Sequence, residues 1–489
     1  MKIKIMALVL MVLMVLTVAA CATPGDTTDT DDTTPSQGAT PGGDPAVETT
    51  TEAGPGLEAV DYEGAEFLVL NLDPNHSTNF PYAEILAESM DGTTINDAVY
   101  ERNEVLNAKY NIKIVSQIEE SRAKLNSAVT TDVNSGDASY DLIMQVPTYS
   151  VVLASQGMLY DYTNLPYVNL EADWWLSEIV NEISIGEKVY YAPNYANICF
   201  LSATGIVYFD KEMITSFELD SPYALVDSGA WTLDQFIKLS TGVTSQHTSS
   251  PEDTVGFRMH PGSWGFMYTG LGGMLIDKDA DDIPVLQIDE LDMTKLEAIA
   301  GLSTNAGMGF YCEYDKVKEA FTAGKTLFVV QGAYDLEYYR QLADFGIVPV
   351  PKWDANQAEY ISTVHQDWGS FMSVEYSQPE DKLEMISAIM EDMAYESLQI
   401  VKPAYYDTVL TGRYAKDAES ARMLDIVYSN VTIDLGILFE YYGIGVDGSV
   451  RGAIKTGNTT LTSAIKTQQR LNNSLLKNVI DAFDKYADR

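Results

Sequence analysis

The chain has 489 residues, of which 71 are acidic and 30 are basic, and its formal net charge is −41. This charge argues against a nucleic-acid partner, because binding a phosphate backbone requires a basic surface. The length exceeds what one hydrophobic core normally organises and favours two domains, and apolar residues make up 46% of the chain.

The first twenty residues have the pattern of a secretory signal. Lys2 and Lys4 precede an apolar run over 5–20 that is shorter than the about 20 residues a membrane-spanning helix needs. Small residues then lead to Cys21 in the string VAAC. A basic start, a short apolar segment and a small-residue cleavage site together predict export.

This cysteine resembles that of a bacterial lipoprotein lipobox, although Val18 stands where a leucine is usual. The resemblance implies that Cys21 carries diacylglycerol and becomes the mature N-terminus. It implies a protein anchored by lipid to the extracellular face of the cell membrane, or to the periplasmic face if the cell has an outer membrane. The alternative is an ordinary signal peptide in which Cys21 is incidental.

Residues 22–57 consist mainly of Thr, Pro, Gly, Asp and Ser and contain almost nothing to bury. Such a segment cannot offset the entropy cost of ordering, so it predicts a disordered stalk. There is no Lys or Arg between Cys21 and Arg102, and an acidic tether is repelled by anionic lipid. We therefore expect a signal peptide at 1–20 and a lipidated stalk at 21–57.

The first part of the remaining body alternates between strand and helix patterns. Strands are predicted at 65–72, 112–118 and 140–146, with helices at 96–110 and 119–133 and a turn at 135–137. This β-α-β-α-β order predicts a parallel sheet with right-handed crossovers. Ligands bind beyond the carboxyl ends of parallel strands, which places Gln145 and Tyr149 at the edge of a cleft.

From residue 140 onward the chain resembles extracellular solute-binding proteins of family 1, which include maltose-binding-protein-like receptors. The first-lobe signature is matched by YDLIMQVPTYSVVLASQGMLYDYTNLP (140–166), and the crossing between lobes by EKVYYAPNYAN and GIVYFDKEMI (within 187–214). Segments 221–240, 320–334, 344–362 and 401–410 continue the match. The resemblance covers 60–489 and implies an α/β, two-lobe periplasmic-binding-protein-like fold with a ligand cleft between the lobes.

The resemblance also implies where the lobes divide. Lobe one is expected at about 60–195 plus 372–430, and lobe two at 205–362 plus 431–489, with hinge crossings near 195–205, 362–372 and 430. Local patterns agree: WTLD (231–234) fits a helix start, and SQPED (377–381) opens an amphipathic helix that extends to Ser397.

Signals for catalysis or for a metal are weak. The four histidines (His76, His247, His260 and His365) are scattered, and there is no H-E-x-x-H, C-x-x-C or G-x-S-x-G motif. The string DKDADD, Asp277 to Asp282, resembles the opening of a calcium loop, but Asp282 replaces the turn-forming glycine and Ile288 the bidentate glutamate. We therefore favour a solvated acidic loop and expect no catalytic residue, metal or cofactor.

Two cysteines remain besides Cys21. Cys199 and Cys312 could pair in an oxidising compartment, but two small buried thiols are the interpretation we favour.

Aromatic residues carry more information about the ligand. A sugar ring stacks its apolar face on Trp or Tyr, while its hydroxyls need a few placed polar groups. Trp174, Trp175 and Trp231 are expected to pack in the core. Trp264 lies in the Gly- and Pro-broken segment 260–273 and is expected on a loop or strand end, and Trp368 is expected at the second crossing.

In sugar-binding members of the family, the regions of Trp264, Tyr334 and Trp368 line the second lobe and the hinge. The resemblance implies ligand contacts at these residues, with core or hinge packing as the alternative for each. The full set of expected contacts is Gln145, Tyr149, Asn197, Trp264, Gln331, Tyr334, Asp367, Trp368 and Tyr441.

The sequence therefore predicts a monomeric receptor that captures a sugar or oligosaccharide and presents it to the membrane permease subunits of an ABC importer. A peptide or another small polar solute is the alternative ligand. A secreted hydrolase would show a catalytic motif and a structural adhesin would show internal repeats, and neither feature is found.

Overall fold

The computed structural model describes residues 54–72, 84–243, 253–302, 309–339, 344–406, 408, 417–456 and 460–486. The expected signal peptide, the Cys21 lipidation site, most of the expected stalk, His76 and His247 lie outside these residues. The chain divides into two units, Met1–Glu52 and Ala53–Arg489, and every element below belongs to the second. Within the described part of the chain, no helix combines the length and apolar character needed to cross a bilayer.

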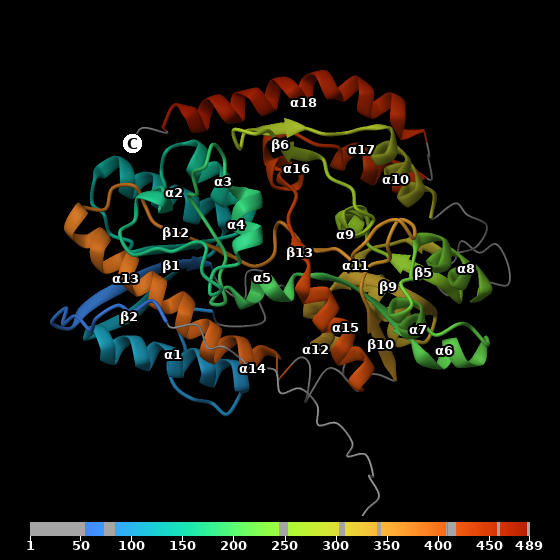
Figure 1. Cartoon of the computed structure of the whole chain (residues 1–489), viewed down its shortest axis with the longest axis horizontal. Coiled ribbons are helices and arrows are strands. Elements are labelled where there is room, and N and C mark those ends of the chain that lie inside the picture. The colour runs from blue at the N-terminus through green and yellow to red at the C-terminus, as the bar shows by residue number, and fades with distance from the viewer. Residues whose placement is uncertain are drawn as a thin grey trace, which may run out of the picture. The chain divides into compact units, whose positions relative to one another are not determined.

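The first sheet has four strands in the order β12-β3-β1-β2. Figure 1 labels three of them, β12, β1 and β2. Strands β1 (Ala65–Leu72), β2 (Ile112–Glu119) and β3 (Leu142–Gln145) are parallel, and β12 (Phe371–Ser373) is antiparallel to β3. Helices α1 (Thr94–Tyr110) and α2 (Arg122–Ser135) connect the parallel strands. The expected β-α-β-α-β unit is confirmed, and Gly136 ends α2 with a φ of 74°, which favours glycine.

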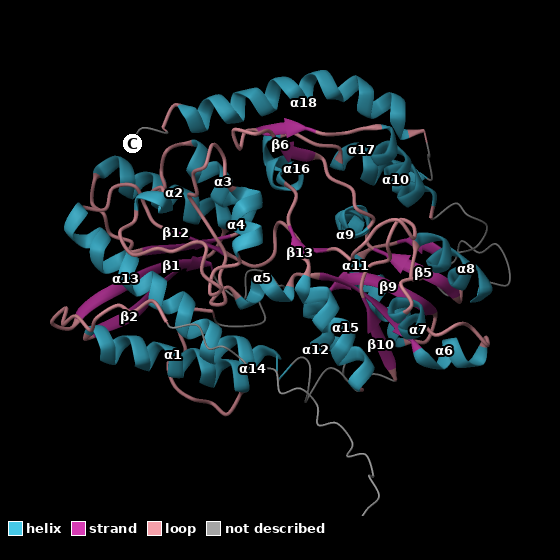
Figure 2. Ribbon diagram, viewed as in Figure 1, coloured by secondary structure: helices cyan, strands magenta, loops and turns pink. Residues whose placement is uncertain are grey.

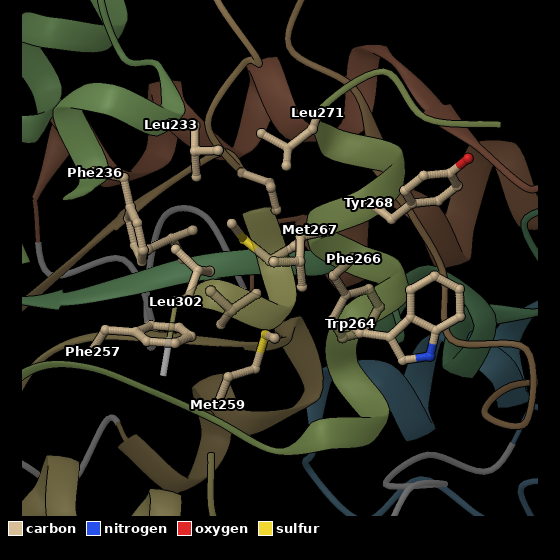
Figure 3. Close-up of a cluster of buried hydrophobic side chains, with 14 of the residues drawn as sticks. Leu233, Phe236, Phe257, Met259, Trp264, Phe266, Met267, Tyr268, Leu271 and Leu302 are labelled. Carbon is tan, nitrogen blue, oxygen red and sulfur yellow. The ribbon is translucent and has the colours of Figure 1, made fainter. Parts of the chain in front are cut away.

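The second sheet has five strands in the order β10-β4-β9-β5-β8. Strands β5 (Val255–Met259), β8 (Gly309–Tyr311) and β9 (Thr326–Gly332) are parallel, whereas β4 (Gly205–Asp210) is antiparallel to both β9 and β10 (Phe345–Val348). Every residue of β9 is buried because helices cover the sheet (Figure 2). Helix α8 (Leu233–Val243) packs Phe236 against Phe257 of β5 (Figure 3).

The chain leaves the first sheet after β3, enters the second at β4, and returns between β10 and β12. The outgoing path contains α5 (Ile198–Ser202), and the return path contains β11 (Ser362–Thr363). Thr204 forms an isolated bridge with Val364, and β11 pairs in parallel with β13 (Val431–Thr432). The connecting segments therefore lie side by side.

The other helices used below are short or peripheral. They are α3 (Pro147–Ser155), α4 (Ser177–Ile183), α9 (Trp264–Gly270), α10 (Glu290–Gly301), α11 (Tyr314–Thr322), α13 (Glu380–Glu396), α14 (Lys402–Tyr406), α15 (Ala418–Ser429), α17 (Asp447–Thr456) and α18 (Leu461–Asp484), with the 3-10 turns η3 (Ala333–Asp335) and η6 (Phe439–Tyr442). The helices predicted from WTLD and SQPED are α8 and α13.

Two C-terminal helices pack differently from the expected division into lobes. Helix α15, expected in lobe one, contacts β10 of the second sheet. Helix α18, expected with lobe two, contacts α10 and α17 but also α3 (Figure 1). Its Phe483 ring lies 5.7 Å from the ring of Tyr190, which packs beside the first sheet. An amphipathic pattern shows that a helix has a buried face, but not which part of the protein covers it.

The acidic loop at 277–282 is the turn between β6 (Ile276–Lys278) and β7 (Pro284–Leu286), and it is not simply solvated as expected. Asp282 accepts hydrogen bonds from the Lys278 ammonium and from the backbone N–H of Glu187, both at 2.8 Å. Asp279 accepts from the backbone N–H groups of Asp281 and Ile283. These bonds give the loop a structural role, holding it against the segment that follows α4.

The expected packing tryptophans are confirmed. Trp174 and Trp175 are 5% and 1% exposed, and both indole N–H groups donate to Glu391. Trp231 is fully buried and donates to the carbonyl of Pro349 at 2.8 Å. Cys199 is buried, Cys312 is half-buried, and no disulfide joins them.

Candidate functional site

The carboxyl ends of the parallel strands carry the candidate site. In the second sheet, His260, Tyr314 and Tyr334 follow the last residues of β5, β8 and β9. In the first sheet, Arg122 follows β2 and Thr148 follows β3. Open α/β sheets bind ligands at such edges, so the topology brings candidate side chains from both sheets to the places where a ligand is expected.

Four rings form what we call the aromatic group: Tyr314, Tyr334, His365 and Trp368. The Trp368 ring lies 4.3 Å from that of His365 and nearly parallel to it, at 15°. The Tyr334 ring stands edge-on to Trp368 with centroids 4.1 Å apart, and Tyr314 is 6.0 Å from Trp368. Trp368 and His365 come from the return path between β11 and β12, so this path packs directly on the second sheet's strand ends.

Asp367 ties the same path to the first sheet. Its carboxylate accepts a hydrogen bond from the Thr148 hydroxyl at 2.8 Å and lies 3.5 Å from the Arg122 guanidinium. Arg122 also donates to the Asp367 carbonyl at 2.8 Å. The Asp367 side chain retains 36% exposure, so it combines a fixed position with access to solvent.

A chain of polar contacts runs from Trp264 to the return path. The Trp264 indole N–H donates to Asp447 at 2.6 Å, and Asp447 pairs with Arg451. Arg451 lies 4.0 Å from Glu440, which accepts from the side-chain amide of Gln366 at 3.1 Å.

The expectation that Trp264 lies on a loop or strand end is wrong. Trp264 begins helix α9, as Figure 3 shows, and its side chain is buried, with 4% exposure.

Tyr149 and Tyr441 form a second aromatic contact, with ring centroids 5.1 Å apart. Tyr149 is half-buried in α3, while Tyr441 in η6 is 57% exposed. The pair joins the segment after β3 to the C-terminal region, and the exposed Tyr441 ring is accessible to a ligand.

Gln331 is the penultimate residue of β9 and is fully buried. Neither its side-chain nitrogen nor its side-chain oxygen has a hydrogen-bond partner among the described residues. A buried amide without partners is costly and uncommon in folded proteins. Gln331 lies three residues before Tyr334 in the chain. This position, together with its unpartnered amide, makes Gln331 the strongest polar candidate of the site.

Two expected contacts are instead occupied by the protein. The Gln145 amide donates to the Arg122 carbonyl at 3.0 Å and to Asn126 at 2.7 Å, and the residue is fully buried. The Asn197 amide donates to the Ser370 hydroxyl at 3.2 Å and is also fully buried. Both side chains support the site's framework: Gln145 holds the start of α2, and Asn197 joins the two connecting paths.

Burial controls the charges around the aromatic group. It lowers the pKa of His365 to about 4, so this imidazole is neutral at pH 7. It raises the pKa of Glu440 to about 7 and that of Asp335 to about 6. The Tyr314 hydroxyl donates to Asp335 at 2.6 Å, which fixes the Tyr314 ring in the group.

Sequence reasoning missed Tyr314, Arg122 and Glu440 as members of this neighbourhood. Tyr314 stands just after a short strand that was not predicted, and Arg122 begins helix α2, whose start was predicted three residues earlier, at Glu119. The available signal was topological: each of these two residues follows the carboxyl end of a parallel strand.

Comparison with known proteins shows the fold. No family model matches the chain, and no curated protein matches its sequence. A cyclic alpha-maltosyl-1,6-maltose binding protein from Arthrobacter globiformis has a TM-score of 0.58 at 15% identity, covering 85% of this chain and 100% of that one. An ABC transporter solute-binding protein from Thermotoga lettingae, bound to alpha-D-tagatose, has a TM-score of 0.52 at 12% identity, covering 84% and 100%.

A third similar structure is UgpB from Mycobacterium tuberculosis in complex with glycerophosphocholine, with a TM-score of 0.54 at 14% identity, covering 78% of this chain and 95% of that one. The expected fold class is therefore confirmed: the chain has the two-lobe, periplasmic-binding-protein-like α/β fold.

Proposed function

We propose that this protein is a solute-binding receptor that captures a sugar or oligosaccharide and delivers it to the permease subunits of an ABC importer. The proposal includes export, a lipid anchor at Cys21 and a monomeric state. The observation that carries it is the aromatic group at the carboxyl ends of the second sheet's strands, on a connecting path that Asp367 ties to the first sheet.

The chemistry of this neighbourhood suits a carbohydrate. The half-buried Trp368 ring and the exposed Tyr441 ring offer flat apolar surface to the face of a sugar. The unpartnered Gln331 amide can both donate to and accept from hydroxyl groups, and the Asp367 carboxylate can accept from them. A few placed polar groups within an aromatic lining are the usual composition of a small-molecule site.

The structural neighbours support a small solute as ligand. The Arthrobacter and Thermotoga proteins bind sugars, whereas the Mycobacterium protein binds glycerophosphocholine. We propose no catalysis, since hydrogen bonds already engage the titratable groups around the aromatic group. The Tyr314 hydroxyl donates to Asp335, Glu440 accepts from the Gln366 amide, and His365 accepts from the backbone N–H of Asp367. No nucleophile–base pair is found in the described part of the site.

A thermal-shift screen tests the proposal. The full chain is melted with linear and cyclic glucans, monosaccharides and polyols, and with glycerophosphocholine and short peptides as comparators. A sugar present at 100 times its Kd stabilises the folded state by about 2.7 kcal/mol. Stabilisation by a comparator alone would reassign the solute class, and turnover of a bound glycan by the purified protein would contradict a pure receptor.

Calorimetry then locates the site. Trp368→Ala removes a stacking surface and is expected to weaken sugar binding by about tenfold or more, which is about 1.4 kcal/mol or more. Trp353→Ala is the matched control, because Trp353 is also half-buried but packs on the core of the second sheet and makes no ring contact with the described residues of the aromatic group. Equal affinities in the two variants would remove Trp368 from the site.

A further inference from the structure

A cavity of about 330 Å³ lies among α4, α5, α14 and α15 and shares no lining residue with the candidate site. Its volume falls within the range of about 300 to 1,000 Å³ that small-molecule sites occupy. The lining combines apolar side chains with the tyrosines Tyr195, Tyr406 and Tyr428 and with the charged residues Asp173, Glu178 and Lys402. The cavity therefore offers flat rings and charge in one place.

Lys402 is the only cation that lines this cavity among the described residues. Its ammonium donates to the Tyr195 hydroxyl at 3.1 Å and lies 4.3 Å and 5.7 Å from the ring centroids of Tyr195 and Tyr406. Within the described ranges it forms no ion pair with a carboxylate, although the chain has 71 acidic residues against 30 basic ones. An ammonium has three donors, so two remain for an anion.

The tyrosine rings form a wall beside this cation. The rings of Tyr406 and Tyr428 lie 5.5 Å apart, and the Tyr428 hydroxyl shares a hydrogen bond of 2.9 Å with that of Tyr405. This bond engages the polar end of Tyr428 and fixes its ring, which leaves the ring face as the part available for packing. A flat, apolar ligand body suits such a wall.

The remaining charges limit the ligand. Asp173 and Glu178 line the same cavity and are exposed at its rim. These carboxylates repel a dianion such as a phosphate monoester about twice as strongly as a monoanion at the same distance, and the single Lys402 ammonium neutralises only one negative charge.

We propose that this cavity is a second binding site, for a small aromatic monocarboxylate whose carboxylate contacts the Lys402 ammonium and whose ring packs on Tyr406 and Tyr428. Nothing in this assignment depends on the sugar-binding function, because the two sets of residues do not overlap.

Titration calorimetry of the full chain with benzoate tests the proposal, with benzamide as the uncharged analogue and inorganic phosphate as the compact anion. We expect saturable benzoate binding, and at least about tenfold weaker binding of benzamide and phosphate. Lys402→Gln removes the charge while keeping a polar chain, and is expected to weaken benzoate binding about tenfold and to abolish the preference over benzamide.

Lys466→Gln, which alters an exposed lysine of α18, is the matched control and is expected to bind benzoate as the parent does. Melting curves verify that both variants fold. Absence of saturable benzoate binding, equal binding of benzoate and benzamide, or unchanged binding in Lys402→Gln would overturn the proposal. Trp368→Ala should leave benzoate binding intact, and a loss there would place benzoate in the candidate sugar site instead.

Discussion

Glu84 joins the two connecting paths between the sheets, and its titration makes the stability of this junction depend on pH. The residue is 3% exposed. One carboxylate oxygen accepts from the backbone N–H of Cys199 at 2.8 Å, on the outgoing path. The other accepts from the Ser370 hydroxyl at 2.5 Å, on the return path.

Burial raises the pKa of Glu84 from 4.5 to about 7, although both hydrogen bonds and the nearby Arg102 favour the charged form. Between these two pH values the folded protein retains a proton that the unfolded chain has lost. The contribution of Glu84 to stability is therefore fully present below about pH 4.5 and is lost as the pH rises to about 7. At about 1.4 kcal/mol per pH unit, the loss is about 3 kcal/mol.

Glu84→Gln replaces the carboxyl by a group of similar shape that does not titrate. Urea unfolding from pH 4.5 to 8, followed by tryptophan fluorescence, gives the free energy of unfolding for parent and variant. The parent's value minus the variant's should fall by about 3 kcal/mol between pH 4.5 and 7 and then level off. Other buried acids, such as Asp434, are common to both proteins and cancel in the difference.

Glu88→Gln is the matched control, because Glu88 lies four residues further along the chain and is exposed. Its difference curve should be flat. If the Glu84→Gln curve is also flat, or rises with pH, then Glu84 is not a buried acid with a raised pKa and the reasoning fails.

Three further predictions concern the core, the anchor and closure. Trp264→Ala should cost about 3 to 5 kcal/mol of stability, as for a buried Trp in a core, whereas sugar affinity should change less than in Trp368→Ala; a fully stable Trp264→Ala variant would contradict its burial. Cys21→Ala should move the protein from the membrane fraction to the soluble fraction or stall its processing, and unchanged membrane partitioning would show that Cys21 is not the anchor. Adding the sugar found by the screen should reduce the radius of gyration in X-ray scattering without altering the sugar chemically, and an unchanged radius would contradict closure of two lobes.

The first sheet could be predicted closely because its signals are local. The segment 65–72 is the strand itself, and the helices that follow have both apolar spacing and a clear end at Gly136. The helix at Trp264 was missed because its local signals are misleading: glycines and a proline surround it. Packing against the second sheet's core stabilises about two turns of helix that the local sequence does not favour.

The side-chain roles within the site could not be predicted, because they depend on partners far along the chain. Gln145 and Asn197 stand where strand ends and crossings were expected, yet their amides are engaged by Asn126 and Ser370. Gln331 occupies an equally typical position and has no such partner among the described residues. Strand order identified Gln145, whereas the family resemblance identified Asn197 and Gln331. Only the tertiary structure separates the two occupied amides from the available one.

The return path, the segment that runs from β10 back to β12, contacts both sheets, so a ligand bound to it can affect how the two sheets are positioned relative to each other. Its Asp367 is held by Arg122 beside the first sheet, while its Trp368 packs against Tyr334 at the end of a second-sheet strand. A ligand that touches Trp368 therefore contacts the segment that connects both sheets. A ligand shifts a conformational equilibrium only by the difference in its affinity for the two states. A change in the relative position of the sheets must alter the contacts of Asp367, Trp368 or both, so a ligand that touches Trp368 would make different contacts in the two arrangements, which is the condition for ligand-driven closure.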